Sequence, residues 1–260
     1  MANKDAWKDA SIVEEYAQQF TLQPPEETIL KRLKASLPTM KMLDLGVGGG
    51  RTTVHFAKLV KEYIGVDYSE EMIAACRKRF LDYPTSVSFA VGDVRCMEQF
   101  KDNTFDFILF SFNGIDYISH AERLAALREI HRVGKTGGYF CFSTHHLKNN
   151  FPMFELKQQL SLRPRRTAKN VAKWFMLRFV YNKYTNIQKL KHVQYAVFND
   201  GVHNHKLQTY HIKPLEQIKQ LKECFNEIEV YSLASGNALT GEVALNRIND
   251  DWLYYLCKLK

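Results

Sequence analysis

The chain has 260 residues, 45% of them hydrophobic and 25% charged, which is the composition of an ordinary globular protein with room for one sizeable core. No apolar run approaches the roughly 18 residues of a membrane-spanning helix, and the N-terminus lacks the apolar core of a secretory signal. We therefore expect a cytoplasmic protein without a transmembrane segment. The five cysteines are scattered and contain no C-x-x-C pair, so the sequence predicts neither a disulfide framework nor a thiolate zinc site.

The net charge of +8 is concentrated in one segment of the chain. Between Leu147 and His192 there are eleven Lys or Arg residues and one acidic residue, Glu155, so this segment carries +10 and the remainder of the chain −2. The local excess marks residues 147–206 as a basic, aromatic-rich insertion.

Apolar runs and turn residues predict alternating helices and strands in one domain spanning residues 1–260. Residues 1–38 hold two helices, at 5–20 and 26–37. Strands follow at 41–45, 63–66, 87–91, 105–110 and 138–144, with helices at 51–60, from Ser69 onward, and at 121–133. After the insertion come a helix at 214–224 and strands at 227–233 and 252–259. This alternation predicts an α/β fold with a mostly parallel sheet covered on both faces.

The first strand runs into a glycine cluster, Asp44-Leu45-Gly46-Val47-Gly48-Gly49-Gly50-Arg51. Bare backbone N–H groups there let a ligand approach closely. A dinucleotide fingerprint G-x-G-x-x-G would require glycine at position 51 or 53, which are Arg51 and Thr53. The G-K-[ST] of a nucleoside-triphosphate loop is also absent. What remains is the pattern D-x-G-x-G-x-G.

This pattern resembles the first motif of the class I S-adenosylmethionine-dependent methyltransferases. The resemblance continues through Asp67 at the end of the second strand, Gly92-Asp93-Val94 after the third, and Phe105-Asp106-Phe107-Ile108 in the fourth. It covers roughly residues 40–145. It implies a Rossmann-like sheet of seven strands, the last of them antiparallel, with a helical or hairpin insertion after strand five.

The resemblance also implies a bound S-adenosylmethionine and a set of residues that hold it. Asp67 would accept the ribose hydroxyls, and Asp93 with the Val94 backbone would read the adenine edge. Tyr68 or Met72 would pack on the adenine face. The remaining cofactor residues would lie around the methionine part: Asp44, Gly46, Gly48, Gly50, Ser111 and, on the leading helix, Tyr16.

Ligands of open α/β sheets bind beyond the carboxyl ends of the strands, which points to the segments after strands four and five. His145 and His146 are the candidate general bases, because imidazole titrates near neutral pH. The candidate substrate contacts are Asn113, Asp116, His205 and Tyr210, and His120 is a weaker catalytic candidate.

The polar stretch from Asn199 to His205 favours a hairpin turn returning to the sheet. His203-x-His205 has a spacing found in metal sites, but no acidic or thiolate partner accompanies it, so we expect no metal.

Three interpretations of the insertion stay open. It forms a lid packed on the domain, it grips an anionic substrate, or it touches RNA or an anionic membrane surface. The predicted function is methyl transfer to oxygen or nitrogen of a small metabolite or natural product, which is anionic under the second interpretation of the insertion. The alternative is a macromolecule methyltransferase acting on RNA such as tRNA, although Ser111-Phe112-Asn113-Gly114 differs from the Asn/Asp-Pro-Pro-aromatic tetrapeptide associated with methylation of base amino groups. A non-enzymatic, cofactor-binding subunit is the third class.

Overall fold

The computed structural model describes residue 16 and residues 18–202, 205 and 207–260. The helix predicted at 5–20 and the metal-spacing residue His203 therefore lie largely or wholly outside the described residues. Within that described part, no helix is both long and apolar enough to cross a membrane.

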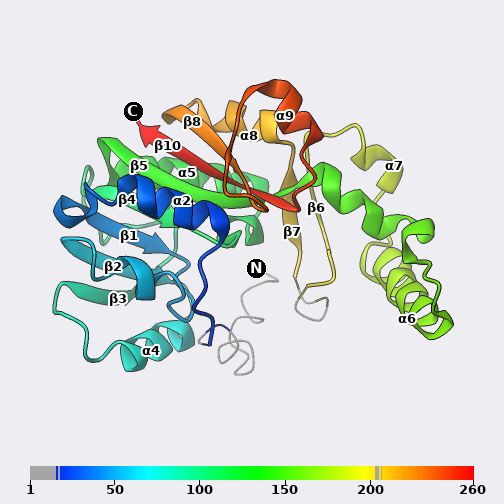
Figure 1. The fold of residues 1–260 in the computed structure, drawn as a ribbon, viewed down its shortest axis with the longest axis horizontal. Coiled ribbons are helices and arrows are strands. Elements are labelled where there is room, and N and C mark those ends of the chain that lie inside the picture. The colour runs from blue at the N-terminus through cyan, green and yellow to red at the C-terminus, as the bar shows by residue number, and fades with distance from the viewer. Residues whose placement is uncertain (1–15, 17, 203–204, 206) are drawn as a thin grey trace.

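A ten-stranded sheet runs through the molecule (Figure 1). Its main strands are β1 (Lys41–Leu45), β2 (Glu62–Asp67), β3 (Val87–Val91), β4 (Phe105–Phe110), β5 (Gly134–His146), β8 (Phe225–Ser232) and β10 (Trp252–Leu259). They lie in the order β3-β2-β1-β4-β5-β10-β8. The pairs among β1 to β5 are parallel, and β10 is antiparallel to both of its neighbours. The predicted fold class is confirmed, with three strands beyond the seven expected: β6 (Tyr195–Phe198), β7 (Thr209–Ile212) and the short β9 (Ala238–Leu239).

Helices cover both faces of this sheet. On one face, α2 (Pro24–Leu33) and α3 (Thr53–Phe56) pack Ile29, Leu33 and Phe56 against Phe107 and Leu109 of β4. On the other face lie α5 (His120–Val133), α8 (Pro214–Leu221) and α9 (Gly241–Arg247). There Leu127 and Ile130 pack against Ile108 of β4, because successive strand residues point to opposite faces. A further helix, α4 (Glu70–Arg79), has Ser69 as its N-cap, whose hydroxyl accepts a hydrogen bond from the Met72 amide at 3.2 Å.

The segment between β5 and β7 has a small core of its own, formed by Leu147, Phe154, Leu177, Leu190 and Phe198. Its elements are the 3-10 turns η4 (Leu147–Phe154) and η5 (Leu156–Gln159), the helix α6 (Pro164–Phe175), the π-helical turn η6 (Met176–Tyr181), α7 (Ile187–Leu190) and strand β6. In Figure 1 α6 stands out at the end of the molecule, away from the sheet. The predicted hairpin is formed by β6 and β7, and β7 joins the sheet by pairing in parallel with the end of β5.

Candidate functional site

The glycine turn after β1 has a backbone that other residues adopt with difficulty. Gly46, Gly48 and Gly50 have φ angles of +60°, +53° and +82°. A Cβ on Gly46 or Gly50 would clash with the rings of Phe110 or Phe80, at 2.8 and 2.3 Å. At Gly48 the nearest atom is Tyr16 Cδ1, at 3.5 Å. Gly46 and Gly50 are thus needed for packing, whereas Gly48 presents bare backbone toward Tyr16.

Asp67 ends β2 beside this turn, and its side chain is almost fully buried. Its Oδ2 accepts a hydrogen bond from the Gly48 amide, and its Oδ1 accepts one from the Ser69 amide, both at 2.9 Å. Burial raises the pKa of this carboxyl, and no Lys or Arg of the described residues pairs with it. A carboxylate has about four acceptor positions, so Asp67 retains capacity for a further hydroxyl donor. These features fit a ligand that carries a diol.

Asp44 is in a different environment below the turn. Its Oδ2 accepts hydrogen bonds from Thr52 Oγ1 at 2.5 Å and from the Tyr63 hydroxyl at 2.6 Å. Burial raises the pKa of this carboxyl to about 6. Asp44 therefore supports the turn from inside the domain through hydroxyl partners.

Asp93 pairs with a neighbour that the motif alone did not indicate. Its Oδ2 lies 2.5 Å from Arg95 Nη2, and Arg95 also pairs with Glu122 of α5. Tyr68 is partly buried next to Asp67, and burial raises the pKa of its hydroxyl. Of the two residues expected to pack on adenine, Met72 is only 1% exposed and Tyr68 is the more accessible. Val94 packs at the edge of the core formed by β4, β5 and α5.

A buried network connects the glycine turn to the ends of β4 and β10. Arg51 binds Glu26 of α2 with two hydrogen bonds of 2.6 Å, and its Nη2 donates to Ser111 Oγ at 2.9 Å. Ser111 also donates to Glu26, and the Tyr254 hydroxyl donates to the same carboxylate at 2.9 Å. The Arg51 guanidinium holds the pKa of Glu26 below its usual range against the opposing effect of burial. Ser111 is therefore hydrogen-bonded to both members of the Glu26–Arg51 ion pair, which no local sequence pattern predicts.

A second buried network holds a histidine at the end of β5. His145 Nδ1 lies 2.8 Å from Asp116 Oδ2, which also accepts the His145 backbone N–H at 2.7 Å. Asp116 Oδ1 accepts hydrogen bonds from Thr144 Oγ1 at 2.6 Å and Arg123 Nη1 at 2.5 Å. Asp116 and Arg123 are both fully buried. The carboxylate fixes the Nδ1–H tautomer of His145 and leaves Nε2 as its basic nitrogen.

Asn113 faces that nitrogen, with its Nδ2 3.4 Å from His145 Nε2. Its Oδ1 is buried and has no hydrogen-bond partner among the described residues. Both Phe112 and Asn113 have positive φ, 55° and 61°, in the turn that follows β4. Strained non-glycine backbone of this kind concentrates at functional sites.

Aromatic rings place the histidine on the same edge as the glycine turn. The Phe112 ring contacts Tyr16 at 6.4 Å and Trp252 at 6.1 Å, centroid to centroid. Trp252 in turn lies 5.9 Å from the His145 ring, and His211 of β7 lies 5.0 Å from it. Tyr16, Phe112, Trp252 and His145 thus form a continuous row.

Sequence reasoning missed Arg123, His211 and Trp252. Arg123 had a signal, because it occupies the same buried face of α5 as Leu127 and Ile130, where an arginine requires an internal acidic partner. His211 and Trp252 reach the site only through strand pairing with His145, which no local pattern indicates.

The other predicted residues lie elsewhere. His146 points to the opposite side of β5, and burial lowers its pKa to about 4. The His205 ring stacks on Tyr181 of the insertion at 4.3 Å. Tyr210 is buried, with its hydroxyl 2.9 Å from His120 Nδ1, and burial raises the pKa of that hydroxyl to about 12. The structure therefore brings together His145, Asp116 and Asn113. Tyr210 reaches this group only through Arg123, whose guanidinium lies 4.7 Å from the Tyr210 ring.

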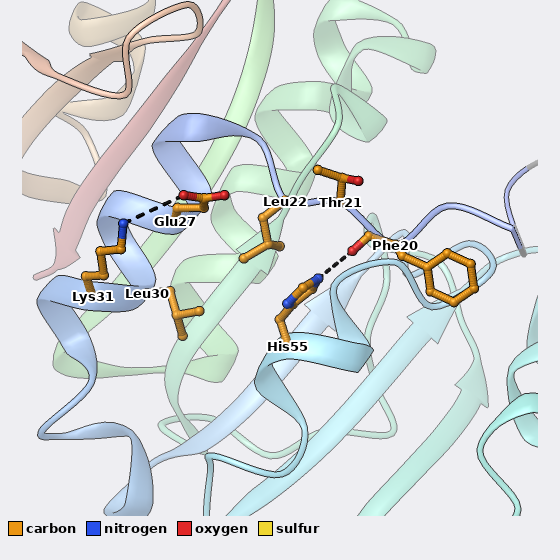
Figure 2. Close-up of a pocket in the computed structure, with 7 residues that line it drawn as sticks. All are labelled: Phe20, Thr21, Leu22, Glu27, Leu30, Lys31 and His55. Carbon is orange, nitrogen blue, oxygen red and sulfur yellow. Dashed lines mark hydrogen bonds and ion pairs between the residues drawn. The ribbon is translucent and has the colours of Figure 1, made fainter.

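No cluster of three or more metal-ligating side chains occurs among the described residues. An open hollow of about 460 Å³ lies between Phe20, the α2 residues Glu27, Leu30 and Lys31, and His55 of α3. Figure 2 shows the side chains that line it. His55 Nε2 there lies 2.5 Å from the Phe20 carbonyl oxygen. None of the predicted site residues lines this hollow.

The comparisons with known proteins agree with this geometry. Residues 42–138 match the family model described as a methyltransferase domain. This match covers the part of the chain that carries the glycine turn and the acidic residues at the end of β2 and after β3, so residues 42–138 form a methyltransferase domain. The resemblance inferred from the four motifs is thereby confirmed.

Relatives of this methyltransferase domain differ in length and in name. An uncharacterised methyltransferase of Schizosaccharomyces pombe is 34% identical over 51% of this chain and 50% of its own length. A demethylmenaquinone methyltransferase of Corynebacterium efficiens is 39% identical over 39% of this chain and 40% of its own length. The chain thus spans half or less of these relatives. The N-methyltransferase NodS of Bradyrhizobium japonicum, solved with S-adenosyl-L-homocysteine, has the same fold, with a TM-score of 0.54 and 15% identity over 96% of this chain and 99% of its own.

Proposed function

We propose that this methyltransferase transfers the methyl group of S-adenosylmethionine to an oxygen or nitrogen of a small acceptor, with His145 as the general base. The observation that carries the proposal is the Asp116–His145 pair, whose Oδ2–Nδ1 distance is 2.8 Å. It stands at the carboxyl end of β5, the edge where α/β sheets bind ligands. The row of rings from Tyr16 to His145 connects it to the glycine turn.

The residues around the glycine turn would hold the cofactor. Asp67, which accepts the Gly48 N–H, would accept the ribose hydroxyls. Gly48 would allow close approach of the ligand to the backbone on the side that faces Tyr16. Asp93 and Val94 are assigned the adenine side, with Tyr68 as the accessible ring. When bound, S-adenosylmethionine supplies an electrophilic methyl group on a sulfonium.

His145 handles the proton that leaves the acceptor. Its Nε2 removes a proton from the acceptor oxygen or nitrogen as the new bond to carbon forms, and Nδ1–H stays hydrogen-bonded to Asp116. The carboxylate stabilises the imidazolium that results, and the ion pair with Arg123 holds the carboxylate in place. The unpartnered Asn113 Oδ1 can accept a hydrogen bond from the acceptor and so orient it.

Two considerations support a small acceptor. The segment after β4, Ser111-Phe112-Asn113-Gly114, lacks the proline pair associated with methylation of base amino groups. In addition, the Corynebacterium relative is named for a quinone acceptor and the Bradyrhizobium protein is named an N-methyltransferase. RNA is the alternative acceptor, and the basic insertion is the observation in its favour.

Substitution of the two neighbouring histidines tests the assignment. His145→Gln should lower turnover by about 10²- to 10⁴-fold with an unchanged cofactor Kd, because it removes the base and leaves the cofactor contacts. His146→Gln, one residue along and on the other side of β5, should retain turnover. Formation of S-adenosyl-L-homocysteine with pools of amine, phenol and carboxylate acceptors is the readout. Full turnover in His145→Gln, or loss confined to His146→Gln, would overturn the assignment.

A further inference from the structure

The insertion exposes large apolar side chains that the fold leaves uncovered. In α6 and η6, Phe175, Met176, Phe179 and Val180 are between 41% and 53% exposed. In the turn before α6, Leu160 is 62% exposed and Leu162 is fully exposed. Scattered single apolar residues on a surface need no explanation, but six large ones exposed within about twenty residues of chain indicate an interaction site.

The opposite face of the same helix packs against the rest of the insertion, so the orientation of the exposed face is determined. Trp174 Nε1 donates to the Phe154 carbonyl oxygen at 2.9 Å, and Leu177 lies in the core of the insertion. Asn182, just after η6, exchanges hydrogen bonds of 2.8 and 2.9 Å with the backbone of Asn199 at the end of β6. These contacts hold Phe175 and Phe179, whose rings lie 5.0 Å apart, on the outer side.

Cations run alongside the apolar side chains. Arg165, Lys169 and Lys173 follow one another at four-residue spacing, which puts them on one face of α6. All three are exposed, and none has an ion-pair partner in the described parts of the chain. The segment from Leu147 to His192 carries a net charge of +10, and the rest of the chain carries −2. The rest of the chain therefore offsets little of the positive charge.

We propose that residues 160–184, named here the α6 arm, bind the surface of an anionic lipid bilayer. An amphipathic helix with Lys and Arg on one side and large apolar side chains on the other lies in the plane of the interface, its apolar side inserted at the boundary between headgroups and acyl chains. Phe175, Phe179 and Leu162 enter that boundary, and the cationic row meets the lipid phosphates. Each basic residue near such a surface adds to the attraction, and the effect falls off within a Debye length.

The side chains favour a bilayer over RNA. Single-stranded RNA is held by aromatic or arginine planes on which bases stack. Leu160, Leu162, Met176 and Val180 offer no such plane, and leaving them exposed beside RNA would gain nothing. In a bilayer the same four side chains leave water, which is favourable in proportion to their apolar area.

Vesicle co-sedimentation of the full chain tests the proposal without any methyl acceptor, so its outcome is independent of the proposed reaction. The chain should sediment with phosphatidylcholine vesicles that contain phosphatidylglycerol and stay in solution with phosphatidylcholine alone. Arg165→Gln/Lys169→Gln/Lys173→Gln should weaken binding by roughly a hundredfold, the sum of three phosphate contacts. Phe175→Ser/Phe179→Ser should weaken it by roughly tenfold or more while the charge is unchanged.

A charge-matched control separates the arm from the net charge of the protein. Lys34, Lys61 and Lys101 are exposed residues outside the insertion, and their triple replacement by glutamine should leave vesicle binding within about twofold. Circular dichroism checks that each variant is folded. Equal loss in this control would overturn the proposal, as would absence of binding to phosphatidylglycerol vesicles. Tight, salt-sensitive tRNA binding that depends on the three arm cations and not on the two phenylalanines would assign the arm to RNA instead.

Discussion

The edge of the sheet and the α6 arm both carry charged side chains, but they use them in opposite ways. At the sheet edge the ion pairs Glu26–Arg51 and Asp116–Arg123 are buried and hydrogen-bonded on several sides. In the arm, Lys169 and its neighbours are exposed and unpaired in the described structure. Buried pairs are hardly screened by salt, whereas exposed cations are screened over about 10 Å at moderate ionic strength. The first arrangement fixes geometry, and the second attracts a partner.

The largest effect is expected from a side chain placed in the glycine turn. Gly48→Val should abolish detectable cofactor binding in calorimetry, because the added atoms occupy the space in front of the bare backbone. Gly137→Val is the matched control: Gly137 also has a positive φ, +78°, but no atom lies within 4 Å of its added Cβ. Both variants bear the same kind of backbone strain, so only the loss of space differs. Normal binding by Gly48→Val would mean that the turn is only structural.

Removing one partner of a buried pair should affect stability next most strongly. Asp116→Ala leaves the Arg123 charge buried without a counter-charge, which costs about 3–5 kcal/mol of unfolding free energy. Lys169→Ala in the arm should change it by less than about 0.5 kcal/mol, as for other surface sites. Urea unfolding measures both. Similar values for the two variants would contradict the distinction between the regions.

Acid should destabilise the protein through His146. The folded-state pKa of His146 is lowered to about 4 from an unfolded value of 6.5, so the unfolded chain binds more protons between these pH values. Stability is therefore lost as the pH falls from about 6.5 to 4, by up to about 3 kcal/mol from this one group. His146→Gln should flatten the dependence of unfolding free energy on pH in that window. An unchanged slope would show that His146 is accessible to protons in the folded state.

The smallest expected effects are the losses of cofactor affinity when Asp67 or Asp93 is replaced by alanine, and these two losses should differ. Asp67→Ala should weaken S-adenosylmethionine binding by about 1.5–3 kcal/mol, as for lost charge-assisted hydrogen bonds. Asp93→Ala should weaken it less, because Asp93 is more exposed and paired with Arg95. Calorimetry on the two variants gives the ranking directly. The reverse order would move the main polar anchor of the cofactor from β2 to the turn after β3.

The sequence predicted the sheet well, because its strands are apolar runs bounded by turn residues. The predicted bounds of β1, β3, β4 and β10 are those observed. The helix expected at 51–60 shortened to Thr53–Phe56, since three left-handed glycines precede it and turns follow it. The domain family and the acidic residues of its motifs were also predictable.

The sequence did not predict which distant polar side chains form hydrogen bonds or ion pairs with each other. His145 was one of two candidate bases, and our proposal for it rests on Asp116, which lies 29 positions away and pairs with it only in the folded chain. Ser111 looked free to contact a ligand until α2 supplied Glu26, 85 positions away. Local patterns predict faces and turns, whereas partners this distant are set by the packing of the whole sheet.

The position of β10 has a consequence for how the chain reaches its folded form. β10 lies between β5 and β8 although it follows both in sequence, and residues 147–251 separate it from β5. Until it inserts, Cys141 and Phe142 of β5 lie on an unpaired strand edge, which is a template for association between chains. Such distant pairing slows folding. During synthesis at the ribosome the newly made chain must therefore keep the edge of β5 covered, and a chaperone that shields apolar strands should raise its yield.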